Sequence, residues 1–247
     1  MRAFEGVDLS IPRGATLAMV GESGAGKSSL ARCVAMLEAP DSGEILFEGA
    51  NISKLRGREL FSLRRKIQLI FQDPSTSLNG RFTAAEIVAE PLEIQRLLTK
   101  PQRRSRALDL MRQVGLPTEW AGKSPFEFSG GQRQRLAIAR ALTLEPKLLI
   151  LDEALSSLDL ANQEMILQTL ADLQSRLGLT YLHISHDLRL VSQFADEVAV
   201  MLEGKIVEQS RAADLFARPK NSYTQQLVHA MPTLESILHD RLQEQPA

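Results

Sequence analysis

Short runs of apolar residues alternate along the chain with longer stretches in which apolar residues recur every three or four positions. The short runs predict buried strands and the longer stretches predict helices. The predicted strands cover residues 15–20, 43–49, 67–71, 147–152, 179–184, 198–202 and 205–208. The predicted helices cover residues 27–37, 129–142 and 160–177, with a helical stretch over residues 83–114 that Pro91 and Pro101 interrupt. Because parallel strands need long crossovers, this alternation predicts an α/β fold with a mainly parallel sheet covered on both faces.

The stretch from about residue 82 to 128 departs from the alternation. It contains no predicted strand, although strand and helix patterns lie before and after it. Together with the helix that follows, it predicts a helical subdomain of about residues 82–140 inserted in a single domain that spans residues 1–247. The last two predicted strands form a small antiparallel part, and the tail of about residues 219–247 is too short for a domain of its own.

The composition narrows the class of protein. Of the 247 residues, 44% are hydrophobic and 24% are charged, which is typical of a globular domain. The formal net charge of -1 disfavours a dedicated nucleic-acid binder, so no nucleic-acid partner is expected. Cys33 is the single cysteine, which excludes a disulfide within the chain and argues against a cysteine-ligated metal. No apolar run reaches the roughly 18 residues of a spanning helix, so we expect a protein that does not itself cross a membrane.

A glycine-rich turn of the form G-x-x-x-x-G-K-[ST] joins the first predicted strand to the helix after it. Its residues are Gly21, Glu22, Ser23, Gly24, Ala25, Gly26, Lys27 and Ser28, followed by Ser29. Glycines let consecutive N–H groups converge on anionic oxygens, and the helix N-terminus adds partial positive charge. Lys27 suits the β and γ phosphates of a nucleotide, and Ser28 suits Mg²⁺. A glycine turn that happens to precede a lysine is the competing interpretation, which the strand–turn–helix context disfavours.

Two carboxylates, Asp152 and Glu153, follow directly on the apolar run of residues 148–151. In an enzyme with a phosphate-binding loop, an acidic residue at the end of such a strand holds the metal ion, which indicates this role for Asp152. The neighbouring Glu153 suits a general base that polarises the attacking water. The alternative is a strand that simply ends in solvent.

A second candidate anion site lies about a hundred residues after the first. Ser129 and Gln132 have the spacing of a capping box, and Gly130 and Gly131 leave the helix start free of side chains. A plain capping box is one interpretation, and a second phosphate site is the other. Because one nucleotide does not need two such sites from one chain, the pattern suggests a dimer in which each copy completes the other's site.

These motifs, taken in order, resemble those of the ATP-binding subunit of ABC transporters. The resemblance rests on the glycine-rich turn, Gln72, the segment Ser129 to Gln132, the strand ending in Asp152 and Glu153, the segment Ser156 to Asp159, and His186. It implies a P-loop NTPase core within a single ABC nucleotide-binding domain. It also implies ATP and Mg²⁺ as cofactors, and a head-to-tail dimer that holds ATP between the loop of one copy and Ser129, Gly130, Gly131 and Gln132 of the other.

The resemblance also implies roles for three further residues. Gln72 contacts the metal and senses the membrane partner, Asp159 lies at the dimer interface, and His186 contacts the γ phosphate. By the same implication Glu153, His186 and Gln72 are the catalytic residues, and Ser28, Gln72 and Asp152 the metal ligands. Taken singly, Gln72, Asp159 and His186 are equally compatible with a turn residue, a helix cap and a histidine at a strand end.

A narrower resemblance points to the branch that imports dipeptides, oligopeptides and nickel. It rests on residues 71–74 and 77–79, the run that begins at Phe126, and Tyr223 and Thr224 ahead of Pro232. This implies a transport-coupled ATPase on the cytoplasmic face of the inner (plasma) membrane. The implied partners are transmembrane permease subunits, a second ABC ATPase subunit of the same or a similar kind, and an external solute-binding protein. The alternatives are a soluble ABC-type ATPase acting on nucleic acid and a scaffold without hydrolysis.

The family pattern places an adenine-stacking aromatic residue about two dozen positions before Gly21, which in this sequence falls ahead of Met1. Three explanations are open: the first strand of the family is lost, the true start of the protein lies upstream, or Phe4 is an imperfect substitute. We therefore expect weakened discrimination for adenine.

Overall fold

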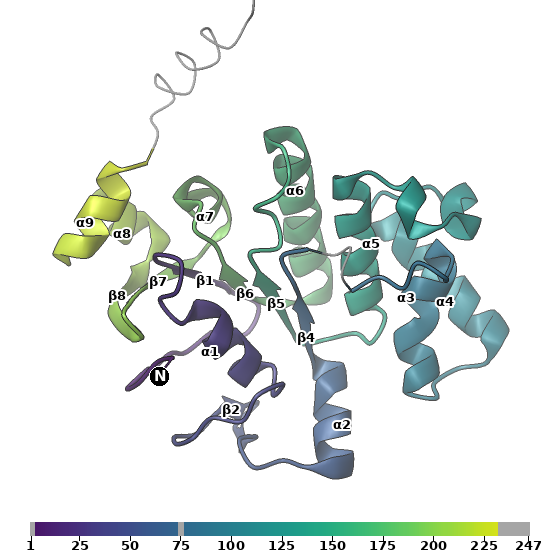
Figure 1. Cartoon of the computed structure of the whole chain (residues 1–247), viewed down its shortest axis with the longest axis horizontal. Coiled ribbons are helices and arrows are strands. Elements are labelled where there is room, and N and C mark those ends of the chain that lie inside the picture. The colour runs from purple at the N-terminus through teal and green to yellow at the C-terminus, as the bar shows by residue number, and fades with distance from the viewer. Residues whose placement is uncertain (1–2, 74–76, 232–247) are drawn as a thin grey trace, which may run out of the picture.

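The main sheet of the molecule has the strand order β4-β5-β6-β1-β7-β8 (Figure 1). The computed structural model describes residues 3–73 and 77–231, so Pro74 and Pro232 of the import-branch pattern lie outside the described residues. The strands from β4 to β7 run parallel, and β8 pairs antiparallel with β7. The strands are β1 (Thr16–Val20), β4 (Ile67–Ile70), β5 (Leu148–Asp152), β6 (Thr180–Ile184), β7 (Glu197–Leu202) and β8 (Lys205–Arg211). The predicted α/β fold with a mainly parallel sheet is confirmed.

Helices connect and flank these strands. They are α1 (Lys27–Val34), α2 (Gly57–Lys66), α3 (Ala84–Ile94), α4 (Lys100–Gln113), α5 (Gly130–Leu142), α6 (Leu160–Leu177), α7 (Leu188–Phe194), α8 (Ala212–Ala217) and α9 (Ser222–His229). The sequence pattern did not predict α2, α7 or α8. α2 is short and mostly polar, and of its three large apolar residues, Leu60, Phe61 and Leu63, only Leu63 is buried, so the segment has too few apolar residues to stand out in the sequence.

Successive residues of each strand face opposite sides of the sheet, and both sides are covered. On β5, Leu148 and Ile150 pack in a cluster that includes Leu30 of α1. Leu149 and Leu151 pack on the other side, in a cluster with buried residues of α5 and α6. Farther along that side, β1 and β7 pack against α7 and α8. Burial on both faces explains why these strands are almost continuously apolar, and why they could be predicted.

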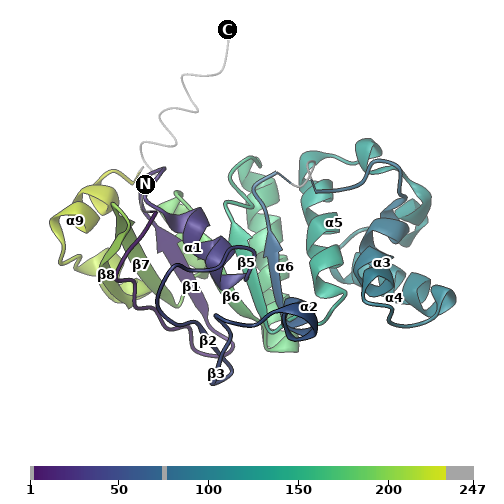
Figure 2. The same ribbon diagram turned by 60° about the horizontal axis from the view of Figure 1, so that its bottom comes forward.

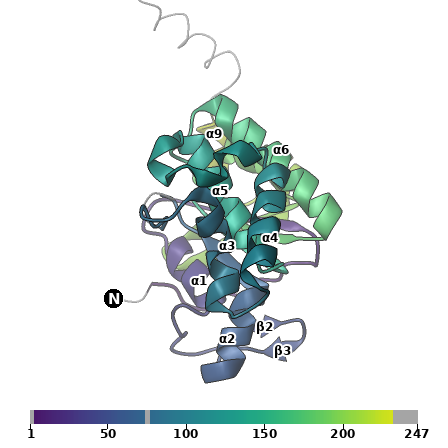
Figure 3. The ribbon, with the colours of Figure 1, turned by 90° about the vertical axis from the view of Figure 1, so that its right-hand side faces the viewer.

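The helices α3, α4 and α5 form a helical lobe at the β4 end of the sheet (Figure 1), at the opposite end of the molecule from β8 (Figure 2), and this lobe faces the viewer in Figure 3. Their buried apolar residues belong to the same cluster as Leu149 and Leu151 of β5. Thr143, which follows α5, donates a hydrogen bond from Oγ1 to the carbonyl of Val88 in α3 at 2.8 Å. Arg140 of α5 also forms an ion pair with Glu90 of α3 at 2.8 Å. Polar and apolar contacts therefore hold α3 and α5 together within the lobe.

The two prolines of the lobe differ in their effect. The prediction that Pro91 interrupts the helical stretch is wrong, because α3 continues through it to Ile94. A proline removes one backbone hydrogen bond of a helix, and the buried Ile87 and Val88 hold α3 against its neighbours. Pro101 lies in the first turn of α4, where its missing N–H group is not needed.

The prediction of one strand over residues 43–49 is also wrong. The structure has a hairpin there, with β2 (Leu46–Phe47) antiparallel to β3 (Ala50–Asn51). Glu48 and Gly49 have φ values of 50° and 79°. Two consecutive residues with positive φ produce a tight hairpin turn, which ends the first strand before Gly49.

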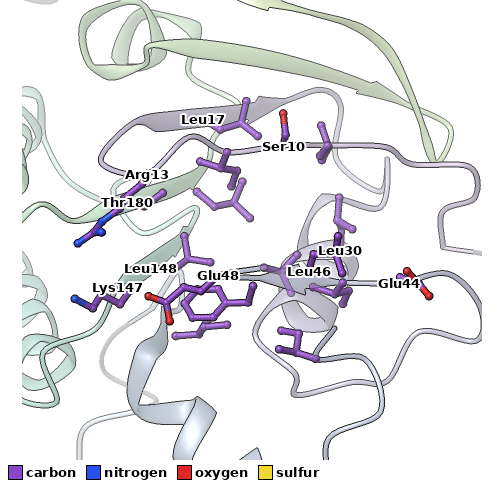
Figure 4. A pocket seen from close by; sticks show the side chains of 18 of the residues that line it. Ser10, Arg13, Leu17, Leu30, Glu44, Leu46, Glu48, Lys147, Leu148 and Thr180 are labelled. Atoms are coloured by element: carbon purple, nitrogen blue, oxygen red, sulfur yellow. The ribbon is translucent and has the colours of Figure 1, made fainter. Parts of the chain in front are cut away.

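A cavity of about 950 Å³ lies between this hairpin and the segment of residues 7–13 (Figure 4). Most of its lining is apolar, including Leu17 of β1, Leu30 of α1 and Leu46 of β2. Leu148 and Thr180, which begin β5 and β6, also line it. The cavity is therefore at the amino ends of the parallel strands, whereas ligands of open α/β sheets bind at the carboxyl ends. Although this cavity is large, its position at the amino ends of the strands argues against its being the predicted nucleotide site.

His183 of β6 is buried without full hydrogen bonding. Its side chain is 1% exposed, and among the described residues Nδ1 has no hydrogen-bond partner. The ring packs edge-on against Phe194, with ring centroids 5.8 Å apart. Burial lowers the pKa of His183 to about 4, and the nearby Asp187 only partly opposes this effect.

Protonation of His183 should therefore destabilise the fold below neutral pH. The unfolded chain binds this proton near pH 6.5 and the folded chain only near pH 4. Between these values the unfolded state holds more protons, so stability falls as the pH falls. From pH 7 to pH 5 this group lowers the free energy of unfolding by about 2 kcal/mol.

Urea denaturation of a His183→Leu variant should show a correspondingly smaller loss between these two pH values. The exposed His229 provides the control, because His229→Gln should keep the full loss. An unchanged pH dependence in His183→Leu contradicts this account.

Among the described residues, none of the helices combines the length and apolar character that crossing a membrane requires.

Candidate functional site

The glycine-rich turn between β1 and α1 is closely packed, and its first and last glycines have a specific reason to be glycine. Gly21 has φ 146°, and a Cβ atom there would lie 2.1 Å from the carbonyl oxygen of Met201 in β7. Gly26 has φ 103°, and its Cβ would lie 2.3 Å from the carbonyl oxygen of Ala3. A side chain at Gly21 would therefore collide with the backbone of β7, and one at Gly26 with the backbone of the N-terminal segment.

The start of α1 can accept an anion. Gly26 is the N-cap and offers no side-chain hydrogen bond to the first N–H groups of the helix. Lys27 is 4% exposed, and Nζ donates to the carbonyls of Gly21 and Glu22, each at 2.8 Å. Burial lowers the pKa of Lys27, while Glu153 and Asp152 oppose the shift. Because phosphate oxygens are stronger partners for an ammonium than neutral carbonyls, this geometry suits exchange for an anion.

Ser28 and Asp152 connect α1 to the end of β5. Ser28 Oγ donates to Asp152 Oδ1 at 2.8 Å. Burial raises the pKa of Asp152, although the hydrogen bond from Ser28 opposes this effect. A hydroxyl and a carboxylate oxygen are ligands that Mg²⁺ prefers. Among the described residues no group of three or more His, Cys, Asp and Glu could hold a metal, so this pair fits an ion that takes its other ligands from phosphates and water.

The backbone of Glu153 is held in a strained conformation. Its φ of 49° is in the left-handed region, which is uncommon for a residue with a side chain. Its N–H donates to the carbonyl of Ile184 at 3.0 Å, and its carbonyl accepts from the backbone N–H and the Oγ of Ser156, at 3.1 and 2.9 Å. The structure also brings His186 to this carboxylate, with Nδ1 3.6 Å from Glu153 Oε2. Strained residues held in this way are frequent at functional sites.

Gln72, which follows β4, is linked to the backbone carbonyl of Glu153 through Ser156. Its Nε2 donates to Ser156 Oγ at 3.3 Å, and that hydroxyl donates to the carbonyl of Glu153. Sequence reasoning noted Ser156 as part of a motif but did not predict this linking role. The signal was too weak, because a serine after an acidic pair is compatible with any turn.

Ser129, Gly130, Gly131 and Gln132 lie in another part of the chain. Ser129 caps α5 by accepting from the N–H of Gln132, and the Gln132 side chain accepts from the N–H of Ser129. α5 lies beside β4, whereas the glycine-rich turn follows β1, with β5 and β6 in between. Three strand spacings correspond to roughly 14 Å. One chain therefore does not bring its two candidate anion sites together.

Asp159 is the N-cap of α6. Its carboxylate accepts from the backbone N–H and the side-chain amide of Asn162, at 3.0 and 2.6 Å. The hydrogen bond from the Asn162 N–H lowers the pKa of this exposed carboxyl group. Within one chain Asp159 therefore has the role of a helix cap.

Two further predicted positions have mainly local contacts. Ser29 Oγ accepts a hydrogen bond from Arg32 at 3.2 Å. Phe4 is half-buried against the cluster that contains Met19 and Met201. Its role as a substitute for an adenine-stacking residue stays a prediction.

Comparison with known proteins agrees with this site. The ABC transporter family model matches residues 4–156. The chain is 50% identical, over 94% of its length, to the probable peptide ABC transporter ATP-binding protein y4tS of Sinorhizobium fredii. It is 46% identical over 95% of its length to the dipeptide transport ATP-binding protein DppF of Escherichia coli, and 44% identical over 96% to the oligopeptide transport ATP-binding protein OppF of Streptococcus mutans. It spans 66%, 70% and 78% of these three relatives.

Two of the solved structures with the same fold are MJ0796 and cbiO1. The cassette MJ0796, in a dimeric post-hydrolysis state bound to ADP and Pi, matches with a TM-score of 0.77 and 31% identity, over 85% of this chain and 90% of that one. The structure of cbiO1 from Clostridium perfringens, part of the ABC transporter complex cbiONQ, matches with a TM-score of 0.81 and 31% identity, over 97% and 92%.

The fold defines an α/β P-loop ATPase, and the glycine-rich turn of residues 21–29 is called the phosphate loop below. The chain belongs to the ABC transporter family, whose ATP-binding subunits hydrolyse ATP. The predicted family, fold, ATP binding and ATPase activity are confirmed. The relatives named above give no support to a soluble ATPase acting on nucleic acid.

A side chain at Gly131 should disturb the contact between α5 and α6. Its Cβ would lie 2.5 Å from Asn162 Oδ1 and 3.2 Å from Asn162 Cβ, whereas a Cβ at Gly130 meets only Leu158, at 3.6 Å. Gly131→Ala should therefore lower the free energy of unfolding by about 1–3 kcal/mol, as measured by chemical denaturation. Gly130→Ala is the matched control and should change it by less than about 0.5 kcal/mol.

Adding Asn162→Ala to Gly131→Ala should restore most of the lost stability, because the opposing side chain is then shortened. If the double variant stays as unstable as Gly131→Ala alone, the contact with Asn162 is not the cause.

Proposed function

We propose that this chain is the ATPase subunit of an importer for peptides or similar small solutes. The observation that carries the proposal is the meeting of the phosphate loop, the Ser28–Asp152 pair and the Glu153–His186 pair at one edge of the sheet. The printed names of the relatives, which include dipeptide and oligopeptide transport proteins, support the class of solute.

The residues of one chain would share the work of hydrolysis. The N–H groups of the loop and the Lys27 ammonium bind the β and γ phosphates, which offsets their charge. Ser28 and Asp152, with Gln72, hold Mg²⁺, which when bound neutralises phosphate charge. Glu153 accepts a proton from the attacking water as general base. His186, 3.6 Å from this carboxylate, orients it and contacts the γ phosphate.

A head-to-tail dimer would complete each site. The start of α5, with Ser129, Gly130, Gly131 and Gln132, faces the nucleotide on the loop of the other copy, and the exposed Asp159 lies at the interface. The separation of the two anion sites within one chain supports this arrangement. The dimeric state of the MJ0796 cassette supports it as well.

The helical lobe would transmit the state of the site to a membrane partner. We assign residues 1–247 to one nucleotide-binding domain, with the lobe as an inserted subdomain of about residues 82–140 and a tail of about residues 219–247. Gln72 leaves β4 beside the lobe and reaches Glu153 through Ser156, which supports a path from the γ phosphate to the lobe. The partners would be permease subunits at the cytoplasmic face of the inner membrane, with an external solute-binding protein.

The Glu153→Gln variant tests the general base. The amide has nearly the same shape but cannot accept the proton, so kcat should fall by about 10²–10⁴-fold while ATP binding persists. Gel filtration with ATP should then show an accumulated ATP-bound dimer. Glu164→Gln, at an exposed position on α6, is the control and should hydrolyse ATP normally. Full turnover by Glu153→Gln removes Glu153 from this role.

Purification from native membranes tests the transport role. The chain should co-purify in detergent with polytopic membrane subunits, and solute-loaded binding protein should stimulate its ATPase rate. Stimulation by DNA or ribosomes, without a membrane partner, contradicts the proposal.

A further inference from the structure

A tyrosine near the end of the described chain contacts the phosphate loop. The phenolic oxygen of Tyr223, in the first turn of α9, accepts a hydrogen bond from the backbone N–H of Glu22 at 3.0 Å. The two residues are 201 positions apart in the sequence. The hydroxyl is therefore the point at which α9 meets the loop that binds phosphate.

The segment before Tyr223 fixes the position of its ring. Asn221 caps α9 by accepting from the Tyr223 N–H at 2.9 Å. The carboxylate of Glu208 in β8 accepts from the backbone N–H of Asn221 at 2.8 Å and from that of Lys220 at 3.0 Å. The Glu208 side chain thus joins the backbone at the start of α9 to strand β8 of the sheet.

The apolar side of α9 packs on the edge of the sheet. Tyr223, Leu227 and Val228 lie against the cluster that contains Val198 and Val200 of β7. Because the aromatic ring already has this packing, the hydroxyl adds one specific interaction, the hydrogen bond from Glu22.

The peptide groups of Glu22 have partners on both sides. Its carbonyl accepts from Lys27 Nζ at 2.8 Å and from the Ala25 N–H at 3.2 Å. When Lys27 turns to a phosphate, the carbonyl of Glu22 loses its charged partner, whereas the N–H keeps Tyr223. The tyrosine hydroxyl is therefore an anchor of the first turn of the loop that does not depend on Lys27.

A second contact from the same end of the chain supports this role. The N–H of Gly204, in the turn between β7 and β8, donates to the carbonyl of Ala25 at 3.0 Å. The loop is thus held at Ala25 by the β7–β8 turn and at Glu22 by α9. Burial raises the pKa of Tyr223, so the phenol stays neutral beside an anionic ligand.

We propose that Tyr223 is a positioning residue for nucleotide binding, which holds the first turn of the phosphate loop through Glu22 and makes α9 a structural part of the site. This inference rests on the nucleotide-binding role of the loop. Without this hydroxyl, residues 21–29 would be less well ordered.

The two tyrosines of the chain, Tyr181 and Tyr223, allow a matched test. Tyr223→Phe removes only the hydroxyl that contacts the loop, so the KM for ATP and the Kd for ADP should rise about threefold to tenfold. The kcat should stay within about twofold, because the loop binds ground state and transition state alike. Tyr181→Phe removes a buried hydroxyl that donates to Leu170 at 2.9 Å; it should lower the Tm and leave KM unchanged.

Fluorine NMR gives an independent readout. In protein labelled with 3-fluorotyrosine, the two resonances are assigned with the two phenylalanine variants. Saturation with ADP should shift the resonance of Tyr223 and leave that of Tyr181 in place. A second variant, Asn221→Ala, loosens the start of α9 without touching the phenol and should raise KM in the same direction.

The outcomes separate this inference from the proposed function. If the wild-type chain does not bind ADP, or if Lys27→Ala binds it as well as wild type does, the nucleotide-binding role of the loop fails. If wild type binds ADP but Tyr223→Phe has the same KM and Kd, and the Tyr223 resonance does not respond to ADP, the positioning role alone is overturned.

Discussion

The parallel register of β1, β5 and β6 is the constraint on which the site depends. Ile184 of β6 pairs with Met19 of β1 on one side and with Asp152 of β5 on the other, so the three strands end at the same level. The phosphate loop follows β1, the acidic pair lies at the end of β5, and the segment with His186 follows β6. A slip of β5 by one residue would move Asp152 by about 3.3 Å and break its 2.8 Å hydrogen bond with Ser28.

Hydrogen bonds to the backbone then give the groups at these ends their orientation. The left-handed conformation of Glu153 costs about 1–2 kcal/mol. Three hydrogen bonds to its peptide groups, from Ser156 and to Ile184, stabilise it by about 1 kcal/mol each, which is enough to offset that cost. Since Ile184 belongs to β6 and Ser156 also bonds with Gln72, the position of the carboxylate depends on three neighbouring strands. The contact with His186 follows from this alignment.

Features with a strong local signal could be predicted from the sequence. The run of residues 148–151 is continuously apolar because β5 is buried on both faces, and this run predicted the strand. The turn after β1 could be predicted from its glycines, which are there because close packing leaves no room for a side chain at Gly21 and Gly26. The hairpin at Glu48 and Gly49 was mistaken for one strand, because a glutamate does not indicate a positive φ. The contact between Tyr223 and Glu22 could not be predicted, since it joins residues 201 positions apart and depends on the docking of α9.

In the proposed dimer, the two helix starts would be the two halves of each nucleotide site. At α1 the N-cap is Gly26, which has no side chain to satisfy the first N–H groups, so an anion can approach them directly. At α5 the side chain of Ser129 reaches the N–H of Gln132, while Gly130 and Gly131 carry no side chains that could cover the others. Both helix starts therefore keep partial positive charge available, but the strand order separates them by β5 and β6. A triphosphate on the phosphate loop of one copy would neutralise the partial positive charge at the start of α1 in that copy. Its remaining negative charge would face the start of α5 in the other copy. In the proposed dimer, electrostatic attraction between that nucleotide and the α5 start of the other copy would favour the closed state only while the γ phosphate is present.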